Sequence, residues 1–133
     1  MEGLTINWLA VIAATLVGFA VGFIWYGPLF GKKWMEATGL TESKIQNGNI
    51  VKVFGFTLVF QFIMAYCLAM FFGNQVNLQE GAFYGFLAGF GWVAMAIGVN
   101  GLYEQKSWNY IFINGGFWIV VYTLMGLILG AWK

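Results

Sequence analysis

Four long apolar blocks, separated by short polar stretches, constrain this chain more than any other feature. Each block has about the 20 residues that an α-helix needs to cross the hydrocarbon core of a bilayer. Only 8% of the 133 residues are charged, whereas roughly a quarter are charged in soluble domains. We therefore predict an all-α integral membrane protein. Its single domain, residues 1–133, is expected to be an antiparallel bundle of four transmembrane helices with short loops, over about residues 5–26, 50–72, 81–103 and 108–132.

The first apolar block ends in the stretch WYGPLFGKKWM, from Trp25 to Met35. Tryptophan and tyrosine rings settle at the membrane–water boundary. The Gly27-Pro28 pair is expected to break the helix, because proline lacks an N–H donor and disfavours helix at the preceding residue. The lysine pair that follows must stay on the water side. We predict a helix exit followed by a short interfacial helix.

The lysines predict the orientation of the bundle. Five lie in the first and third connecting segments, whereas only Lys133 lies on the opposite side; the five are Lys32, Lys33, Lys44, Lys52 and Lys106. By the positive-inside rule both connecting segments are cytoplasmic and both termini are periplasmic. The first block is too long for a signal peptide and has no basic region before it. We expect a multi-pass protein of the bacterial cytoplasmic (inner) membrane.

Residue types that are missing limit the function. The chain has no His, Arg or Asp and a single cysteine, Cys67, so we expect no transition-metal site and no cofactor. A net charge of +1 gives no basic surface for nucleic acid. No nucleophile–base pair or phosphate-binding loop indicates an enzyme. No Asp, Glu, Lys or His lies in the middle of an apolar block, which argues against proton-coupled transport.

Small residues recur at four-residue spacing in every block. The stripes are Ala10, Ala14, Gly18 and Gly22; Ala65, Ala69 and Gly73; Gly81, Gly85 and Gly89; and Gly126 and Gly130. Such stripes let helix backbones approach closely in lipid. They can pack one bundle or face a second subunit. Because four stripes exceed the needs of one small bundle, we favour a homo-oligomer in the membrane lipids, with other membrane proteins as candidate partners.

A set of polar side chains is expected near the membrane midplane: Thr15, Gln61, Trp92 and Trp118. An amide in hydrocarbon is unfavourable unless it is hydrogen-bonded, so Gln61 should face inward and bond the indole of Trp92 or Trp118. One interpretation is a structural hydrogen bond. The other is a small-molecule pocket lined by tryptophans.

A second polar cluster is predicted nearer the cytoplasmic side, and its members are Tyr26, Lys32, Lys33, Asn100, Tyr103, Glu104 and Asn114. These groups could bind an anionic headgroup or a polar cytoplasmic ligand. They could equally cap helix ends and set the orientation.

The motif WYGPLFGKKW resembles the DUF1761 family, a bacterial domain-of-unknown-function family. The resemblance continues through Thr38-Gly39-Leu40, Ile113 to Gly116, Leu124-Met125-Gly126 and Ile128 to Trp132. It implies a small integral membrane protein with four helices. It implies no activity and no site residues.

Two classes of function remain open. The first is a small oligomeric bundle that handles a lipid, an ion or a small solute without proton coupling. The second is a structural or accessory subunit that packs against other membrane proteins. A polar cavity would favour the first class, and a solid glycine-packed bundle would favour the second.

Overall fold

The computed structural model describes residues 5–132. It is 84% helical, without a strand in the described part. Within that range, four helices are long and apolar enough to cross a membrane: Trp8–Leu29, Ile50–Phe72, Leu78–Tyr103 and Trp108–Ala131. The predicted all-α membrane bundle is confirmed, and the chain is described below as a multi-pass membrane protein.

The first span consists of α1 (Trp8–Ile24) and a wider π-helical turn, η1 (Trp25–Leu29). Asn7 caps its start by accepting a hydrogen bond from the Ala10 N–H. The break predicted at Gly27-Pro28 was wrong, because the chain stays helical through Leu29. The wider turn accommodates proline: the Phe30 N–H donates to the Trp25 carbonyl, five residues back, at 2.9 Å.

Two short helices connect the first span to the second. The first, α2 (Gly31–Thr38), follows the π-helical turn where the sequence predicts a helix, and it ends at Gly39 with a left-handed φ of 76°. The second, α3 (Glu42–Gln46), begins after Thr41, whose hydroxyl accepts from the Lys44 N–H. The positive φ of Gly39 is a common way for a helix to end.

The second span is α4 (Ile50–Phe72), and the last is α7 (Trp108–Ala131). The third span begins at Leu78, three residues before the predicted start, because Asn77 and Glu80 form a capping box. It is divided into α5 (Leu78–Ala88), the π-helical segment η2 (Gly89–Ala94) and α6 (Met95–Tyr103). The sequence did not predict this π-helical interruption.

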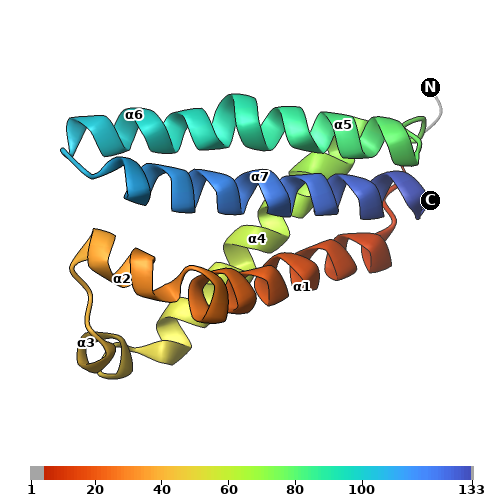
Figure 1. The fold of residues 1–133 in the computed structure, drawn as a ribbon. Coiled ribbons are helices and arrows are strands. Elements are labelled where there is room, and N and C mark those ends of the chain that lie inside the picture. The colour runs from red at the N-terminus through yellow and green to blue at the C-terminus, as the bar shows by residue number, and fades with distance from the viewer. Residues whose placement is uncertain (1–4, 133) are drawn as a thin grey trace.

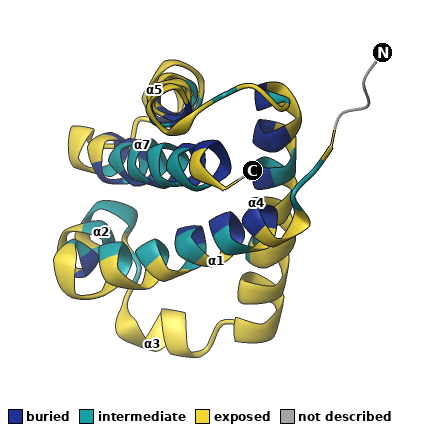
Figure 2. Cartoon of the chain, turned by 90° about the vertical axis from the view of Figure 1, so that its right-hand side faces the viewer, coloured by how far each residue is buried: buried dark blue, intermediate teal, exposed yellow. Residues whose placement is uncertain are grey.

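The helix α7 is the central element of the fold. It runs beside α5 and η2 and also packs against α1, whereas α4 packs mainly against α1 and crosses the other helices obliquely (Figure 1). Loops as short as those predicted here usually make consecutive helices close neighbours, but α4 and α5 are not. Burial follows the same arrangement, since α3 and the start of α4 are exposed and α7 is mostly covered (Figure 2).

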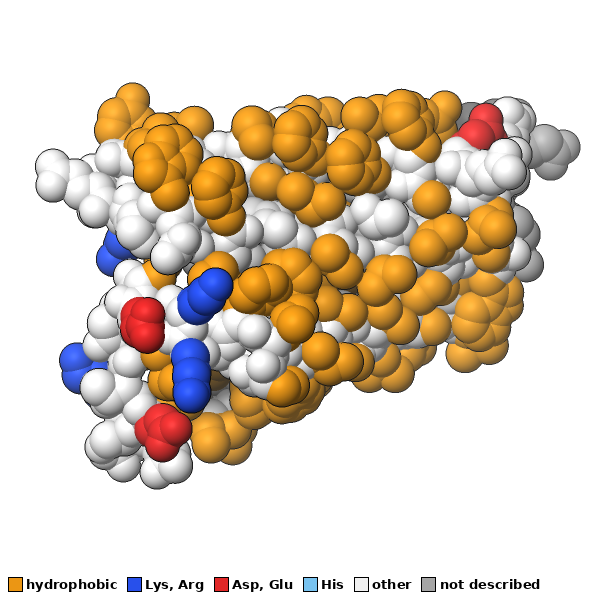
Figure 3. All heavy atoms as spheres, in the orientation of Figure 1, with side chains coloured by type: hydrophobic (Ala, Val, Ile, Leu, Met, Phe, Trp, Pro, Cys, Tyr) orange, Lys and Arg blue, Asp and Glu red, His pale blue; other side chains and the backbone are white. Residues whose placement is uncertain are grey.

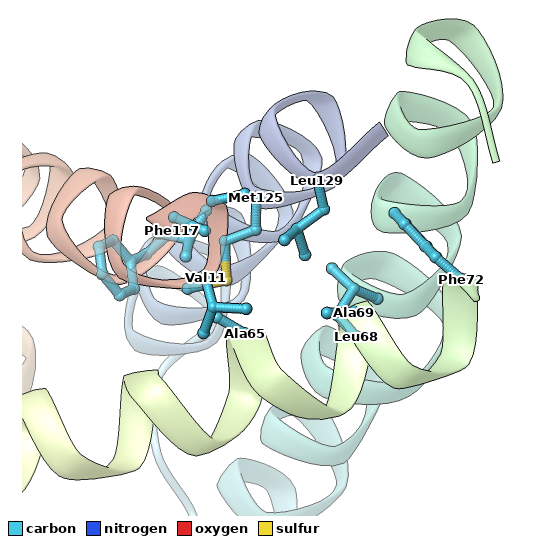
Figure 4. Packing of buried hydrophobic residues seen from close by; sticks show 11 residues of the cluster. Val11, Ala65, Leu68, Ala69, Phe72, Phe117, Met125 and Leu129 are labelled. Atoms are coloured by element: carbon cyan, nitrogen blue, oxygen red, sulfur yellow. The ribbon is translucent and has the colours of Figure 1, made fainter. Parts of the chain in front are cut away.

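The apolar core lies between α1, α4 and α7. Val11, Val121 and Met125 are fully buried, and Ala65, Leu68 and Phe117 contribute to the same cluster (Figure 4). Ala10 and Ala14 are also fully buried, so the small-residue stripe of the first span faces the core.

The glycines of α5 and α7 bring two backbones into contact. A Cβ added to Gly126 would overlap the carbonyl oxygen of Gly81, and one added to Gly85 would overlap the carbonyl oxygen of Tyr122. Gly130 faces the Asn77 carbonyl in the same way, and Gly89 lies against the backbone of Trp118. The stripes therefore pack helices of one chain, and they no longer argue for a second subunit.

Candidate functional site

A hollow of about 510 Å³ lies between α1, α4 and α7. Its walls are mainly aromatic, and the hollow is called the aromatic chamber below. The lining residues are Phe19, Gly22, Phe23, Tyr26, Gly27, Trp34, Ile45, Val53, Phe54, Thr57, Gln61, Phe117 and Trp118. None of these side chains carries a formal charge at neutral pH. The volume lies within the range of small-molecule sites in proteins.

Gln61 belongs to this lining and is only 3% exposed. The prediction that its side chain faces inward is therefore confirmed. Its carboxamide oxygen is buried and has no hydrogen-bond partner among the described residues. A Cβ added to Gly18 would lie 2.6 Å from that oxygen, so the amide packs against the bare backbone of α1. The predicted bond from a tryptophan indole to this amide was wrong.

The other predicted midplane residues are dispersed. Trp118 lines the aromatic chamber with Gln61, whereas Trp92 of η2 is 66% exposed and contacts Phe71 of α4. Thr15 is buried, but its hydroxyl donates to the Val11 carbonyl of its own helix at 2.8 Å. The structure thus joins only Gln61 and Trp118 in one site. No pattern in the sequence predicted that Trp92 rotates away from the core.

A second hollow, of about 340 Å³, adjoins the aromatic chamber and is called the polar mouth. The two hollows share Tyr26, Gly27, Trp34 and Ile45. The polar mouth adds Lys32 from α2 and Glu42 and Gln46 from α3. Charged side chains gather at this end of the molecule, while its long flank is mostly apolar (Figure 3). The joint site therefore has a polar end and an apolar end.

The predicted cytoplasmic-side cluster is divided between two places. The Tyr26 hydroxyl donates to the Asn114 side-chain oxygen at 2.6 Å, which ties η1 to α7. Asn114 also lines a separate hollow of about 290 Å³ with Asn100 and Glu104. Lys32 instead belongs to the polar mouth. Lys33 is exposed, and Tyr103, 85% exposed, points away from the bundle.

An apolar groove of about 570 Å³ separates α4 from α5 and η2. It is lined by Met64, Cys67, Leu68, Phe71, Phe72, Tyr84, Leu87, Ala88, Gly91, Trp92, Val93 and Tyr122. Cys67 is exposed here and does not pack in the core. The groove is larger than the aromatic chamber, but it lacks a buried amide.

Sequence reasoning missed the phenylalanines that line the aromatic chamber. Phe19 and Phe23 lie one turn apart on α1, and both contact Phe54 of α4 with ring centroids 5.6 Å away. Thr57 and Gln61 have the same four-residue spacing on α4. Residues four apart share a helix face. The aromatic face of α1 and the polar face of α4 could together have indicated the chamber. Phenylalanines are so common in membrane helices, however, that their spacing alone does not indicate a site.

Comparison with known proteins gives one match. The model of a family described as "Protein of unknown function (DUF1761)" matches residues 9–130, which is nearly the whole chain. No curated protein and no solved structure matches the chain.

Proposed function

The chain belongs to the DUF1761 family of proteins of unknown function, and we propose that it binds a membrane lipid or another small amphiphile in the aromatic chamber. The observation that carries this proposal is that the aromatic chamber and the polar mouth lie side by side and share four lining residues. One elongated molecule could place its polar head in the mouth and its tail in the chamber. The absence of charge in the chamber lining agrees with handling that is not coupled to protons.

The chemistry of both ends supports an amphiphile. Lys32 offers a cation and Glu42 an anion to a polar head, and Trp34 and Tyr26 are rings of the kind found at membrane–water interfaces. On entering the chamber, the tail would exchange contacts with bilayer chains for contacts with aromatic side chains. Both surroundings are apolar, so the solvation free energy of the tail would change little. A water-soluble ion is a poorer candidate for the chamber, because the lining supplies no charge to replace its hydration.

Photolabelling tests the proposal directly. The wild-type chain would be reconstituted in phosphatidylcholine vesicles with a trace of dodecanoic acid that carries a diazirine on its chain, irradiated and mapped by mass spectrometry. We expect labels on Phe54, Thr57 and Phe117 of the chamber, in preference to Phe56 and Phe60, which are exposed on α4.

A matched pair of glycine variants provides the control. The nearest atom to a Cβ on Gly22 is 3.7 Å away on Phe117, so Gly22→Leu should fill part of the chamber and reduce its labelling. Gly55 lies on α4 with no atom within 4 Å of an added Cβ, so Gly55→Leu should not change it. Labelling spread evenly over the exposed apolar residues, or unchanged in Gly22→Leu, would reject a chamber site.

The orientation is part of the proposal, because it decides which leaflet supplies the ligand. Lys32, Lys44 and Lys106 belong to segments at the same end of the molecule as the polar mouth, and such a lysine bias indicates the cytoplasmic side. After Cys67→Ala, single cysteines near Glu36 should resist an impermeant thiol reagent in intact cells. Labelling from outside would show that the protein has the opposite orientation in the membrane.

A second candidate function is an accessory subunit that packs against another copy or another membrane protein. The apolar groove between α4 and α5 favours it, because helices that diverge there leave an apolar surface in the lipid. The glycine stripes no longer support it. Sizing in mild detergent with Trp92→Ala, at the groove rim, would test it: a homo-oligomer built on this groove should dissociate.

A further inference from the structure

The inner end of the aromatic chamber has an unusual combination of groups. Gln61 lines a cavity wall made mostly of aromatic and aliphatic side chains, and its carboxamide oxygen lacks a partner among the described residues. A buried acceptor without a donor is unfavourable, and most such groups in proteins are satisfied. Replacing Gln61 by an apolar residue would avoid that cost. A ligand that supplies the missing donor would explain why an amide is present here.

Thr57 lies one helical turn from Gln61 and lines the same chamber. Its hydroxyl donates to the Val53 carbonyl at 2.6 Å, so its proton is engaged and its oxygen can still accept. Both side chains therefore offer acceptors on one face of α4. Because the terminal torsion of a glutamine side chain is broad, the Gln61 oxygen can turn from Gly18 toward a ligand.

We infer that the amphiphile carries an uncharged hydrogen-bond donor, such as a hydroxyl, at its buried end, and that Gln61 selects for it. This inference rests on the proposed function, since it assigns the ligand of the same chamber. A charged group at that end is excluded by the uncharged lining. A plain hydrocarbon chain would leave the Gln61 oxygen unsatisfied.

The dimensions of the site suit a medium-length chain. Gly27 belongs to both the polar mouth and the chamber, and Gly18 lies against the Gln61 amide. These glycines are nine residues apart (27 − 18), which is about 13 Å along a helix. A head beside Lys32 and a hydroxyl beside Gln61 can therefore belong to one straight molecule.

The test is competition between two probes that differ by one hydroxyl. Dodecanoic acid and ω-hydroxydodecanoic acid would each compete with the diazirine probe for chamber labelling of the reconstituted full chain. We expect the hydroxy acid to compete at about a tenfold lower concentration, the effect of one net hydrogen bond. In Gln61→Leu the two acids should compete equally. Phe60→Leu, an exposed position on the same helix, should retain the tenfold difference.

The outcomes separate the two claims. Equal competition by both acids in the wild type, with the chamber still labelled, would overturn the selectivity and leave the proposed function standing. A hydroxyl preference that persists in Gln61→Leu would overturn the assignment to Gln61. A chamber that is never labelled would overturn both. The wild-type comparison decides the selectivity even where Gln61→Leu does not fold.

Discussion

Two helix pairs in this molecule use small residues in opposite ways. Between α5 and α7 the glycines of both helices face each other, and carbonyl oxygens occupy the space where side chains would be. Between α1 and α4 both helices carry buried alanines, but glycines line the contact on α1 only. Gly18 of α1 faces the Gln61 amide, and Gly22 faces no atom nearer than the Phe117 ring at 3.7 Å.

The difference shows that a glycine stripe brings two backbones into contact only where the facing helix is also free of large side chains. Small residues on both helices bring the α5 and α7 backbones together. On the α1 side, long side chains from α4 and α7 cover the stripe, and the aromatic chamber remains where they do not fill the space. The tight pair serves stability, and the loose pair provides the candidate site. The predictions below test this contrast, starting with the largest effect.

Gly126→Ala should be the most damaging of these changes. Its Cβ would overlap the Gly81 carbonyl oxygen, which is backbone and cannot rotate away, so α5 and α7 must separate. We expect the free energy of unfolding in detergent to fall by about 3 kcal/mol, the upper end of typical overpacking. Circular dichroism during thermal unfolding would measure it. Gly55→Ala is the matched control, because an added Cβ there meets nothing within 4 Å; equal melting temperatures for the two variants would refute the tight contact.

The tight pair was largely predictable from the sequence, and the loose pair was not. Apolar length predicted all four spans, and the positions of Gly85, Gly89, Gly126 and Gly130 predicted a close contact. The Gly27-Pro28 break failed because a π-helical turn can accommodate proline. The aromatic chamber depends on the angle at which α4 crosses α7 (Figure 1). Many side chains together set this angle, so no local sequence pattern predicts it.

Gly18→Ala should have an intermediate effect. The added Cβ would lie 2.6 Å from the Gln61 carboxamide oxygen and 3.2 Å from Met125 and Val121. All three are side-chain atoms that can move, so we expect a loss of about 1–2 kcal/mol, within the usual range for overpacking. Gly22→Ala is the control and should stay close to the wild type. A Gly18→Ala loss as large as that of Gly126→Ala would show that the α1 contact is as rigid as the α5 contact.

Trp25→Phe should have a smaller effect, about 1 kcal/mol. The indole N–H of Trp25 donates to the Ile113 carbonyl at 2.9 Å, which joins the end of the first span to α7. Phenylalanine keeps much of the apolar contact and removes the donor. Trp108→Phe, at an exposed ring near the start of α7, is the control. Identical unfolding curves for both variants would mean that this hydrogen bond between η1 and α7 contributes nothing to the free energy of unfolding.

Gln61→Leu should have the smallest effect on stability, less than about 1 kcal/mol in either direction. Leucine has similar bulk and removes a buried acceptor that has no partner, so packing is kept and a desolvation cost disappears. Thermal unfolding of the ligand-free chain in detergent would measure the change. A loss of about 2 kcal/mol or more would show that the amide is bonded within the protein, and Gln61 would then be a structural group like Thr15. A near-neutral result, together with a lost hydroxyl preference in the competition experiment, would separate ligand recognition from folding on this side of the bundle.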